Sequence, residues 1–404
     1  MATPTRPAHR EDFHIAIICA LPLEADAMTL LFDDNWDDDN NPYGQASQDT
    51  NTYTTGRIGL HNVVLVILGN MGTSSAAAAT VNLRSSYNNV ELALLVGICG
   101  GVPKIAGEDV FLGDVVLSKT IIQYDYGRQY PGNFVMKNLI EDSLGRARKG
   151  IRSLLVNFQT RDGKDTLQTK AKQHLKRLQN LAETRRLQGS RRKRAEDKYR
   201  YPGSAEDKLY SADYTHIHRT SCELCELCEL CVSGSGDFCE SSKASCAETG
   251  CDEANLVVRA FPFEDDDYTP EIFIGRVGSG NTVMKSGKDR DRIAVAHNLI
   301  AFEMEGAGVW EEVPCIVVKG ICDYADSHKN KKWQDFAAAT AASVARAILE
   351  RYFVNYEPQA QALKAPDAQG NGLEQTNSIR SVANNSFGNH VKINQGDSWG
   401  DITF

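Results

Sequence analysis

Short apolar runs rich in β-branched residues recur along this chain of 404 residues and alternate with stretches of helical periodicity. Runs of this length and composition are typical of strands buried in a sheet. Their alternation with helices predicts an α/β fold with a largely parallel sheet. The predicted strands are 14–19, 62–69, 91–97, 114–118 and 314–320, and the predicted helices are 23–32, 74–85 and 333–352.

The composition predicts one large domain, residues 13–356, between two segments of different character. Residues 1–12 are polar and interrupted by proline, and we expect a tail there. Residues 357–404 are rich in Gln, Asn, Gly and Ser, which predicts a flexible linker followed by a short C-terminal motif. A basic and cysteine-rich stretch at about 190–265 predicts a surface insertion, and we expect that residues 205–262 can be deleted without loss of the core fold.

The overall charge and hydropathy exclude two classes of partner. A formal net charge of −9 argues against a chain whose main partner is nucleic acid. No apolar run approaches the roughly 18 residues needed to span a bilayer, so we expect no membrane contact and a cytoplasmic location. The basic run 185–200 is compatible with nuclear localisation, although a solvated helix face is the simpler interpretation. Apolar surroundings predict buried free thiols at Cys19, Cys99, Cys315 and Cys322.

Polar side chains follow several of the predicted strands where those strands end. Glu24 comes after the first strand, Glu303 and Glu305 lie in the string LIAFEMEGAG, and Asp323 follows the strand PCIVVKG. A glycine-rich turn that contains Gly100 follows the strand at 91–97. Ligands of open α/β sheets bind beyond the carboxyl ends of the strands. Acids that meet at this edge suit glycosidic cleavage, which needs one group to protonate the leaving base and another to activate water.

Six motifs resemble one known family in wording and in order. The strings ALPLEADAM, GNMGTSSAAAAT, VGICGGVP, GDVVLS, FEMEGAGVW and VKGICDYAD are similar to the nucleoside phosphorylase and nucleosidase superfamily, in particular its fungal branch fused to NLR-type receptors. The resemblance covers about 13–150 and 268–352. It implies a three-layer phosphorylase/hydrolase-like fold with a central mixed, largely parallel sheet, and it implies cleavage of the N-glycosidic bond of purine nucleosides or nucleotides.

The resemblance also implies a role for each matching residue. Asp323 would donate a proton to the purine N7, and Glu24 with Glu303 would activate water. Glu305 would bind the ribose hydroxyls, and Met304 would pack under the sugar. The implied substrate contacts further include Val283 in the base pocket, Cys99 and Gly100 in the glycine-rich turn, and Lys319. The resemblance implies no cofactor.

Two positions bear on the choice between hydrolysis and phosphorolysis. Phosphorylases of this superfamily commonly bind phosphate through arginines at the places occupied here by Leu95 and Glu24. We therefore expect hydrolysis. The alternative is a phosphate-dependent phosphorylase that binds phosphate through another group, such as Arg128. Lys319 stands where the nucleosidases have Arg, and these two side chains are not equivalent in bidentate contacts.

Three further expectations concern partners and metals. The family implies a homo-oligomer, and the small residues of 74–85 would permit close packing between subunits. The C-terminal motif resembles those that connect effector modules to NLR-type signalling partners, so a nucleoside-sensing module is a further alternative to an enzyme. The repeat CELCELCELC has the CxxC spacing of zinc ligands, but simple repeat expansion is the favoured interpretation. Its cysteines are Cys222, Cys225, Cys228 and Cys231.

Overall fold

The computed structural model describes residues 6–37, 43–137, 140–188, 198–216, 244–262 and 264–352. These residues belong to a single compact unit that extends to Asn355. The predicted C-terminal linker and motif, like the CELC repeat, lie outside the described residues. The larger elements are β1 (Ile15–Cys19), α1 (Pro22–Leu30), β3 (Tyr53–Ile58), β4 (His61–Ile67), α2 (Thr73–Ser86), β5 (Leu92–Gly101), β8 (Val115–Gln123), α3 (Lys149–Phe158), α4 (Arg161–Gln188), β11 (Ile272–Ser279), α7 (Gly287–His297), β12 (Leu299–Glu303), α8 (Gly306–Trp310), β13 (Cys315–Asp323) and α9 (Lys332–Leu349).

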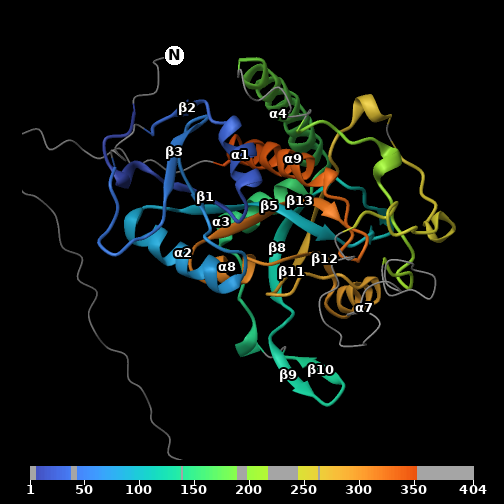
Figure 1. Ribbon diagram of the computed structural model, residues 1–404. Helices are drawn as coiled ribbons and strands as arrows, with labels where there is room; N and C mark the ends of the chain where they lie inside the picture. Colours follow the sequence, from blue (N-terminus) through green and yellow to red (C-terminus); the bar gives the residue numbers. More distant parts are fainter. Residues whose placement is uncertain are drawn as a thin grey trace, which may run out of the picture. The chain divides into compact units, whose positions relative to one another are not determined.

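A mixed sheet of nine strands forms the centre of this unit (Figure 1). Its order is β12-β11-β8-β13-β5-β1-β4-β3-β2, where β2 is the short strand Asp34–Asn35. The pairs β1–β4, β1–β5, β5–β13, β8–β11 and β11–β12 are parallel, whereas β8–β13, β3–β4 and β2–β3 are antiparallel. The predicted central mixed, largely parallel sheet is confirmed.

One end of the sheet closes on itself. β12 pairs with β11 on one side and with the end of β5 on the other, where Ala301 lies opposite Gly101 and Phe302 lies opposite Gly100. Five strands, β12, β11, β8, β13 and β5, therefore form a closed ring, and β1 to β4 extend from β5 as an open sheet. The sequence pattern did not predict β11, β12 or this closure.

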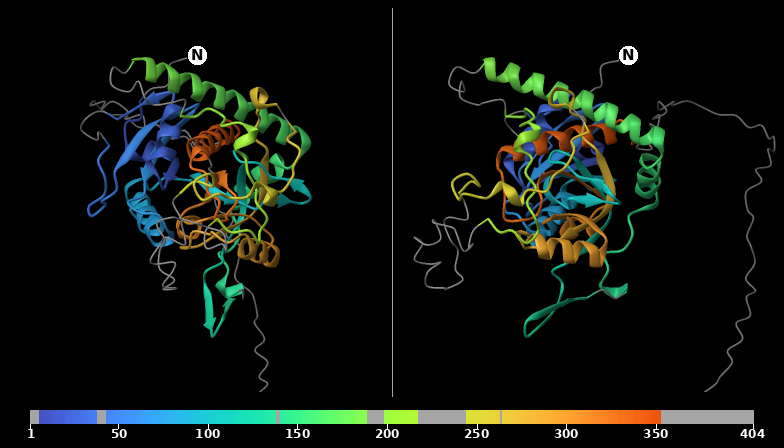
Figure 2. Two further views of the ribbon diagram at one scale, coloured as in Figure 1. Left: turned by 45° about the vertical axis from the view of Figure 1, so that its right-hand side comes forward. Right: turned by 90° about the vertical axis from the view of Figure 1, so that its right-hand side faces the viewer.

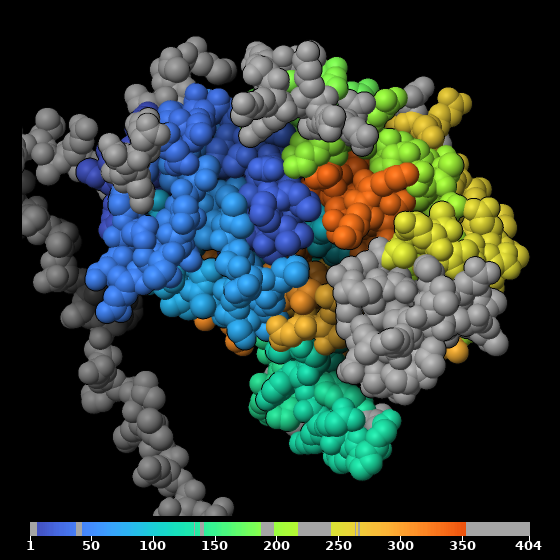
Figure 3. Space-filling view, in the orientation of Figure 1, coloured from blue at the N-terminus to red at the C-terminus, as the bar shows by residue number. Residues whose placement is uncertain are grey.

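Helices cover both faces of the sheet. α9 packs on β13 and β5, and α1 lies beside α9, so that segments from opposite ends of the described chain are neighbours (Figures 1 and 3). α2 packs against α8 on the other face. A Cβ on Gly308 would lie 1.9 Å from the Thr73 carbonyl oxygen, so the small residues here allow two helices to approach closely. Packing within the subunit thus explains the alanine-rich run, and its use between subunits stays a prediction.

Arg161–Gln188, a segment rich in Lys and Arg that precedes the predicted insertion, forms the long helix α4. This helix crosses the outer surface of α9 (Figure 2). Leu167, Ala171, Leu175 and Leu178 are buried along one side of it. Their spacing of three and four residues gives an apolar stripe. Several basic residues beside the stripe pair with acids of neighbouring segments, as Lys172 does with Asp267 and Arg177 with Asp33. The apolar spacing was present in the sequence, but the density of basic residues concealed it.

The expectation that 205–262 is dispensable is corrected by the contacts of this segment. Asp207 and Arg259 form a buried ion pair of 2.7 Å, and the Tyr324 hydroxyl donates to Asp207 Oδ1 at 2.6 Å. The Leu112 N–H also donates to Asp207, at 2.9 Å. Deletion would leave Tyr324 and Leu112 without these partners, and unsatisfied buried groups cost about 1–3 kcal/mol each. The described parts of the insertion are therefore built into the core.

Among the residues that the structure describes, no helix is both long and apolar enough to cross a membrane.

Candidate active site

A cavity of about 250 Å³ lies where β1, β5, β12 and β13 end. The four acids predicted from the sequence, Glu24, Glu303, Glu305 and Asp323, all line this cavity, and so does Met304. This placement agrees with the rule that α/β sheets bind ligands beyond the carboxyl ends of their strands. The lining residues are Ala20, Leu21, Glu24, Met71, Ile98, Cys99, Gly100, Thr282, Val283, Met284, Phe302, Glu303, Met304, Glu305, Cys322, Asp323, Ala325, Lys329 and Gln334.

Glu24 is held by the backbone around it. Its Oε2 atom accepts hydrogen bonds from the N–H groups of Ala20 at 2.8 Å and Leu21 at 2.9 Å, and its Oε1 atom accepts one from Ile98 at 2.8 Å. A carboxylate has about four acceptor positions. Three are therefore occupied, and one on Oε1 remains for a water molecule. Burial raises the pKa of Glu24, although the Lys319 ammonium acts in the opposite direction.

Glu303 is fixed by the start of α8. Its carboxylate accepts hydrogen bonds from the Glu305 N–H at 3.0 Å and from the Gly306 N–H at 2.9 Å to Oε2 and 3.0 Å to Oε1. Burial raises the pKa of Glu303 and the charge of Glu305 adds to this, while Lys319 opposes it. Both oxygens are engaged, so Glu303 supports the arrangement of the turn and contributes negative charge to the cavity.

Lys319 lies at the centre of the acid cluster. Its Nζ is 3.1 Å from Glu305 Oε2, and both side chains are buried. Burial lowers the pKa of Lys319, but the carboxylates of Glu305, Glu24 and Glu303 outweigh this effect and hold it above its ordinary value. Three carboxylates around one ammonium would leave two negative charges uncompensated if all were ionised. Buried charge without a partner is costly, which agrees with the raised pKa of Glu24 and of Glu303.

Asp323 forms a second charged group with a residue that the sequence analysis did not identify. Lys329 Nζ donates to Asp323 Oδ2 at 2.9 Å, and the Ala325 N–H donates to Oδ1, also at 2.9 Å. Burial lowers the pKa of Lys329, but the carboxylate of Asp323 outweighs burial and raises it. Lys329 is six residues beyond Asp323, in the loop before α9. Only its proximity to a predicted acid in the chain could have suggested it.

Two glycines allow these acids to approach the backbone of β5. A Cβ on Gly97 would lie 2.1 Å from Glu24 Oε1, and a Cβ on Gly100 would lie 2.9 Å from Asp323 Oδ1. Any side chain at either position would displace an acid. The absence of side chains at Gly97 and Gly100 thus leaves room for the carboxylates of Glu24 and Asp323.

The structure brings together most of the predicted site residues. The cavity is lined by the acids together with Cys99, Gly100, Met304 and Val283. Lys319 lies beside the cavity, where it contacts Glu305. Val283, with 46% of its surface exposed, lies at the opening.

Arg128 is the exception. It lies on an exposed hairpin formed by β9 (Gly127–Tyr130) and β10 (Asn133–Met136), which projects from the rest of the unit (Figures 1 and 3). Arg128 does not line the cavity within this chain, so the suggestion that it binds phosphate there is corrected.

A larger cleft, of about 980 Å³, lies between α4, α9 and residues 198–206. It is lined by charged side chains of both signs, among them Lys172, Lys198, Glu206 and Asp335, and Lys198 and Lys332 pair with acids across it. None of the predicted catalytic residues lines it. Its chemistry is that of a solvated polar surface, and the smaller cavity is the candidate active site.

Comparison with known proteins shows which families this chain is similar to. Residues 14–179 match the family model described as the phosphorylase superfamily. This part of the chain is therefore similar to the phosphorylase superfamily, the family that the motifs resemble. A similar curated protein is a nucleotide-binding leucine-rich repeat (NLR)-like protein of the fungus Hyaloscypha variabilis, 30% identical over 348 residues. The match covers 84% of this chain but 29% of that protein, so the chain spans less than a third of its relative's length.

Solved structures with a similar chain path include two enzymes of Helicobacter pylori. These are the 5′-methylthioadenosine/S-adenosylhomocysteine nucleosidase, at 13% identity, and futalosine hydrolase, at 14% identity, each with a TM-score of 0.47 and each covering 84% of this chain and 99% of its own. The S-adenosylhomocysteine nucleosidase of Streptococcus pyogenes is 15% identical, with a TM-score of 0.47, and covers 84% of this chain and 97% of its own.

Proposed function

We propose that this domain hydrolyses the N-glycosidic bond of a purine nucleoside or nucleotide. The observation that carries the proposal is the placement of Asp323 and Glu24 in one cavity, each fixed by backbone N–H groups and neither blocked by a side chain from β5. One acid can serve the leaving base and the other can serve water. A cavity of about 250 Å³ suits a small molecule rather than a macromolecule.

In the proposed reaction the bond between the sugar carbon and the base nitrogen breaks, and its electron pair stays with the base. Asp323 transfers a proton to N7 of the leaving purine, and because Asp323 is paired as a carboxylate with the Lys329 ammonium, that proton comes from Lys329 Nζ, 2.9 Å from Asp323 Oδ2. Water adds to the sugar carbon as Glu24 accepts its proton at the open position of Oε1. The carboxylates of Glu303 and Glu305 supply negative charge toward an oxocarbenium-like centre. The products are free base and free sugar.

The cations at the cavity favour hydrolysis over phosphorolysis. Within the described part of the chain, the ammonium groups at the cavity are those of Lys319 and Lys329, and each is paired with a carboxylate. A phosphate ion would have to compete with Glu305 or Asp323 for them. Glu24 would in addition repel phosphate from the place where water is proposed to bind.

The test of this proposal is product analysis. The purified full chain is incubated with a panel of purine nucleosides and nucleotides, with and without phosphate, and the products are separated by chromatography. We expect free base together with ribose, or with a ribose phosphate from a nucleotide, at a rate independent of added phosphate. Strict dependence on phosphate with ribose 1-phosphate as product would instead establish a phosphorylase. Binding without turnover of any compound would favour a sensing module, the alternative to which the NLR-like relative draws attention.

The proposed role of Glu24 predicts a pH dependence. A general base acts in its ionised form, so kcat/KM is retained above the pKa of Glu24 and lost as the pH falls through it. Because burial raises that pKa, we expect the acidic limb of the profile above the ordinary glutamate value of about 4.3. Lys319→Gln removes the charge that opposes this shift, and the limb should move to still higher pH. The exposed exchange Lys288→Gln should leave the profile unchanged. A limb that moves to lower pH in Lys319→Gln would contradict the assignment.

A further inference from the structure

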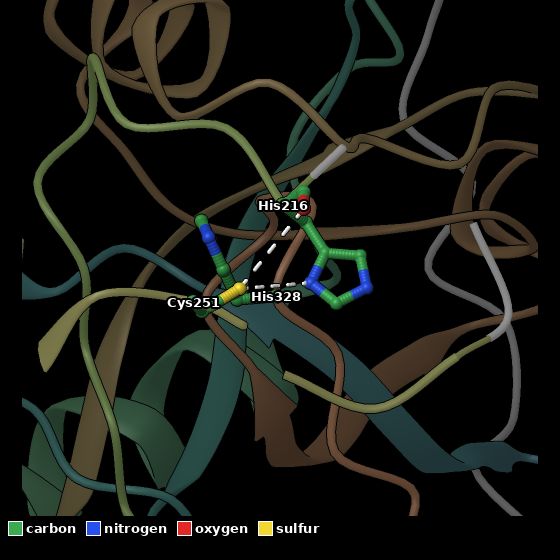
Figure 4. A group of neighbouring side chains, drawn as sticks. All are labelled: His216, Cys251 and His328. Carbon is green, nitrogen blue, oxygen red and sulfur yellow. Dashed lines mark hydrogen bonds between the residues drawn. The ribbon is translucent and has the colours of Figure 1, made fainter. Parts of the chain in front are cut away.

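A second cluster of chemically active side chains lies apart from the cavity. His216 ends the described segment 198–216, Cys251 lies in the segment 244–262, and His328 lies in the loop between β13 and α9 (Figure 4). One ligand atom from each lies within 4.8 Å of the others. In Figure 4 the Cys251 sulfur faces the His216 ring, with the His328 ring on its other side. Three chain segments thus meet through groups that bind transition metals.

Two sulfur–nitrogen distances in this cluster fit a tetrahedral zinc site. Cys251 Sγ lies 3.4 Å from His216 Nδ1, and Cys246 Sγ lies 3.6 Å from the same nitrogen. Zn–N and Zn–S bonds of usual length place a nitrogen and a sulfur ligand about 3.6 Å apart in a tetrahedron. The C-x₄-C spacing of these two cysteines is within the range found in zinc sites. The cluster therefore offers two sulfur and two imidazole ligands.

The proton on His216 is positioned for metal binding. Its Nε2 atom lies 2.9 Å from the carbonyl oxygen of Ala244. A carbonyl only accepts hydrogen bonds, so Nε2 carries the proton, and the lone pair is on Nδ1, which faces both sulfurs. Histidine ligands of zinc usually donate their second N–H to a carbonyl or carboxylate in this way. The Thr249 hydroxyl lies 3.2 Å from Cys251 Sγ and 3.4 Å from His216 Nδ1, where it can donate to a thiolate.

His328 is held rigidly against the same cluster. Its ring stacks on Tyr210 with a centroid distance of 4.2 Å and on Tyr214 at 5.5 Å. Its backbone N–H donates to Asp326 Oδ1 at 2.8 Å, and the backbone N–H of His216 donates to Ser327 Oγ at 3.0 Å. These contacts hold the loop and the insertion against each other, and such preorganisation lowers the entropy cost of forming the site.

We propose that His216, Cys246, Cys251 and His328 form a structural zinc site. Zn²⁺ would displace one proton from each thiol, so that binding forms four ligand bonds and releases two protons. Two thiolates and two imidazoles favour zinc over harder cations and leave no position open for a substrate. The site joins both described parts of the insertion to the loop whose next residue, Lys329, pairs with Asp323.

The experiment separates this cluster from the CELC repeat. In the control variant, Cys222, Cys225, Cys228 and Cys231 are all replaced by Ser in the full chain. After desalting, elemental analysis should find one zinc per chain in this variant. Addition of Cys246→Ser and Cys251→Ser to it should remove that zinc. Cobalt(II) bound to the control should give the visible bands of tetrahedral coordination and thiolate-to-metal charge transfer, and both should be lost with the two cysteines.

A second variant keeps the test interpretable if the serine variant does not fold. In this variant, His216→Cys replaces one zinc ligand by another. If the double serine variant fails to fold, His216→Cys in the control background should still bind cobalt, with stronger thiolate-to-metal absorption. The proposal is overturned if the control variant binds neither zinc nor cobalt. It is equally overturned if metal persists at full stoichiometry without Cys246 and Cys251, or if mass spectrometry of the native chain finds these two joined as a disulfide.

Discussion

Replacement of Asp323 by Asn should lower kcat/KM for nucleoside cleavage by about 10²–10⁴-fold, the usual cost of losing a general acid. The amide has nearly the same shape, so the hydrogen bond from the Ala325 N–H to Oδ1 can remain. What is lost is the carboxylate that relays the proton and that holds Lys329 at 2.9 Å. The loss should therefore appear in the rate of bond cleavage, measured under single-turnover conditions, while the fold is retained.

The matched control is Asp213→Asn, because Asp213 is an exposed aspartate paired with Lys288 at the surface. It should cleave at the wild-type rate and unfold at the wild-type temperature. Cleavage by Asp323→Asn at a rate close to wild type would show that another group protonates the base. Lys329 would then be the first candidate, since its ammonium is the proton donor nearest to Asp323 among the described contacts.

Glu24→Gln should reduce both activity and stability. Three backbone N–H groups donate to the two oxygens of Glu24, and the amide can offer one oxygen. At least one N–H group would face an NH₂ group, which costs about 1–3 kcal/mol for the unsatisfied buried donor. Loss of the base should lower kcat/KM by a further factor of about 10²–10⁴. Glu183→Gln on the exposed side of α4 is the control, and it should affect neither quantity.

The substitution Gly97→Ala tests the role of Glu24 while leaving the Glu24 side chain itself unchanged. The new Cβ would lie 2.1 Å from Glu24 Oε1 and force the carboxylate out of its position. Gly150→Ala adds the same methyl group where nothing lies within 4 Å. Turnover should fall in the first variant and persist in the second. If Gly97→Ala and Glu24→Gln are both stable and fully active, Glu24 does not activate water.

Several parts of this architecture follow from local sequence signals. The five predicted strands correspond to β1, β4, β5, β8 and β13, because continuous apolar runs mark strands buried on both faces. The acids were predictable as a group, since they follow strands that end at one edge of the sheet. The strand β11 was not identified, because glycine and arginine interrupt its apolar pattern, and β12 was not identified, because its apolar run is only Leu299–Phe302.

Other features depend on contacts between segments that are far apart in the chain. Lys329 acquires its role only when the loop before α9 folds back on Asp323. The His216 cluster combines residues separated by more than a hundred positions, and neither histidine stands in a metal-binding motif. The CELC repeat has the sequence spacing of zinc ligands, whereas the cysteines of the proposed zinc site are Cys246 and Cys251. The buried Asp207 could likewise not be distinguished from any other acid in a polar stretch.

The pairing of β12 with β5, which closes the sheet, determines how the cavity can unfold. Because Phe302 of β12 pairs with Gly100 of β5, the strand that leads to Glu303 is hydrogen-bonded directly to the turn that accommodates Asp323. Neither segment can open alone without breaking this ladder. Local unfolding usually occurs where backbone hydrogen bonds are few and exposed. Amide protons around Gly100 and Phe302 should therefore exchange with solvent only when the whole ring opens, so the cavity is retained or lost as one cooperative unit.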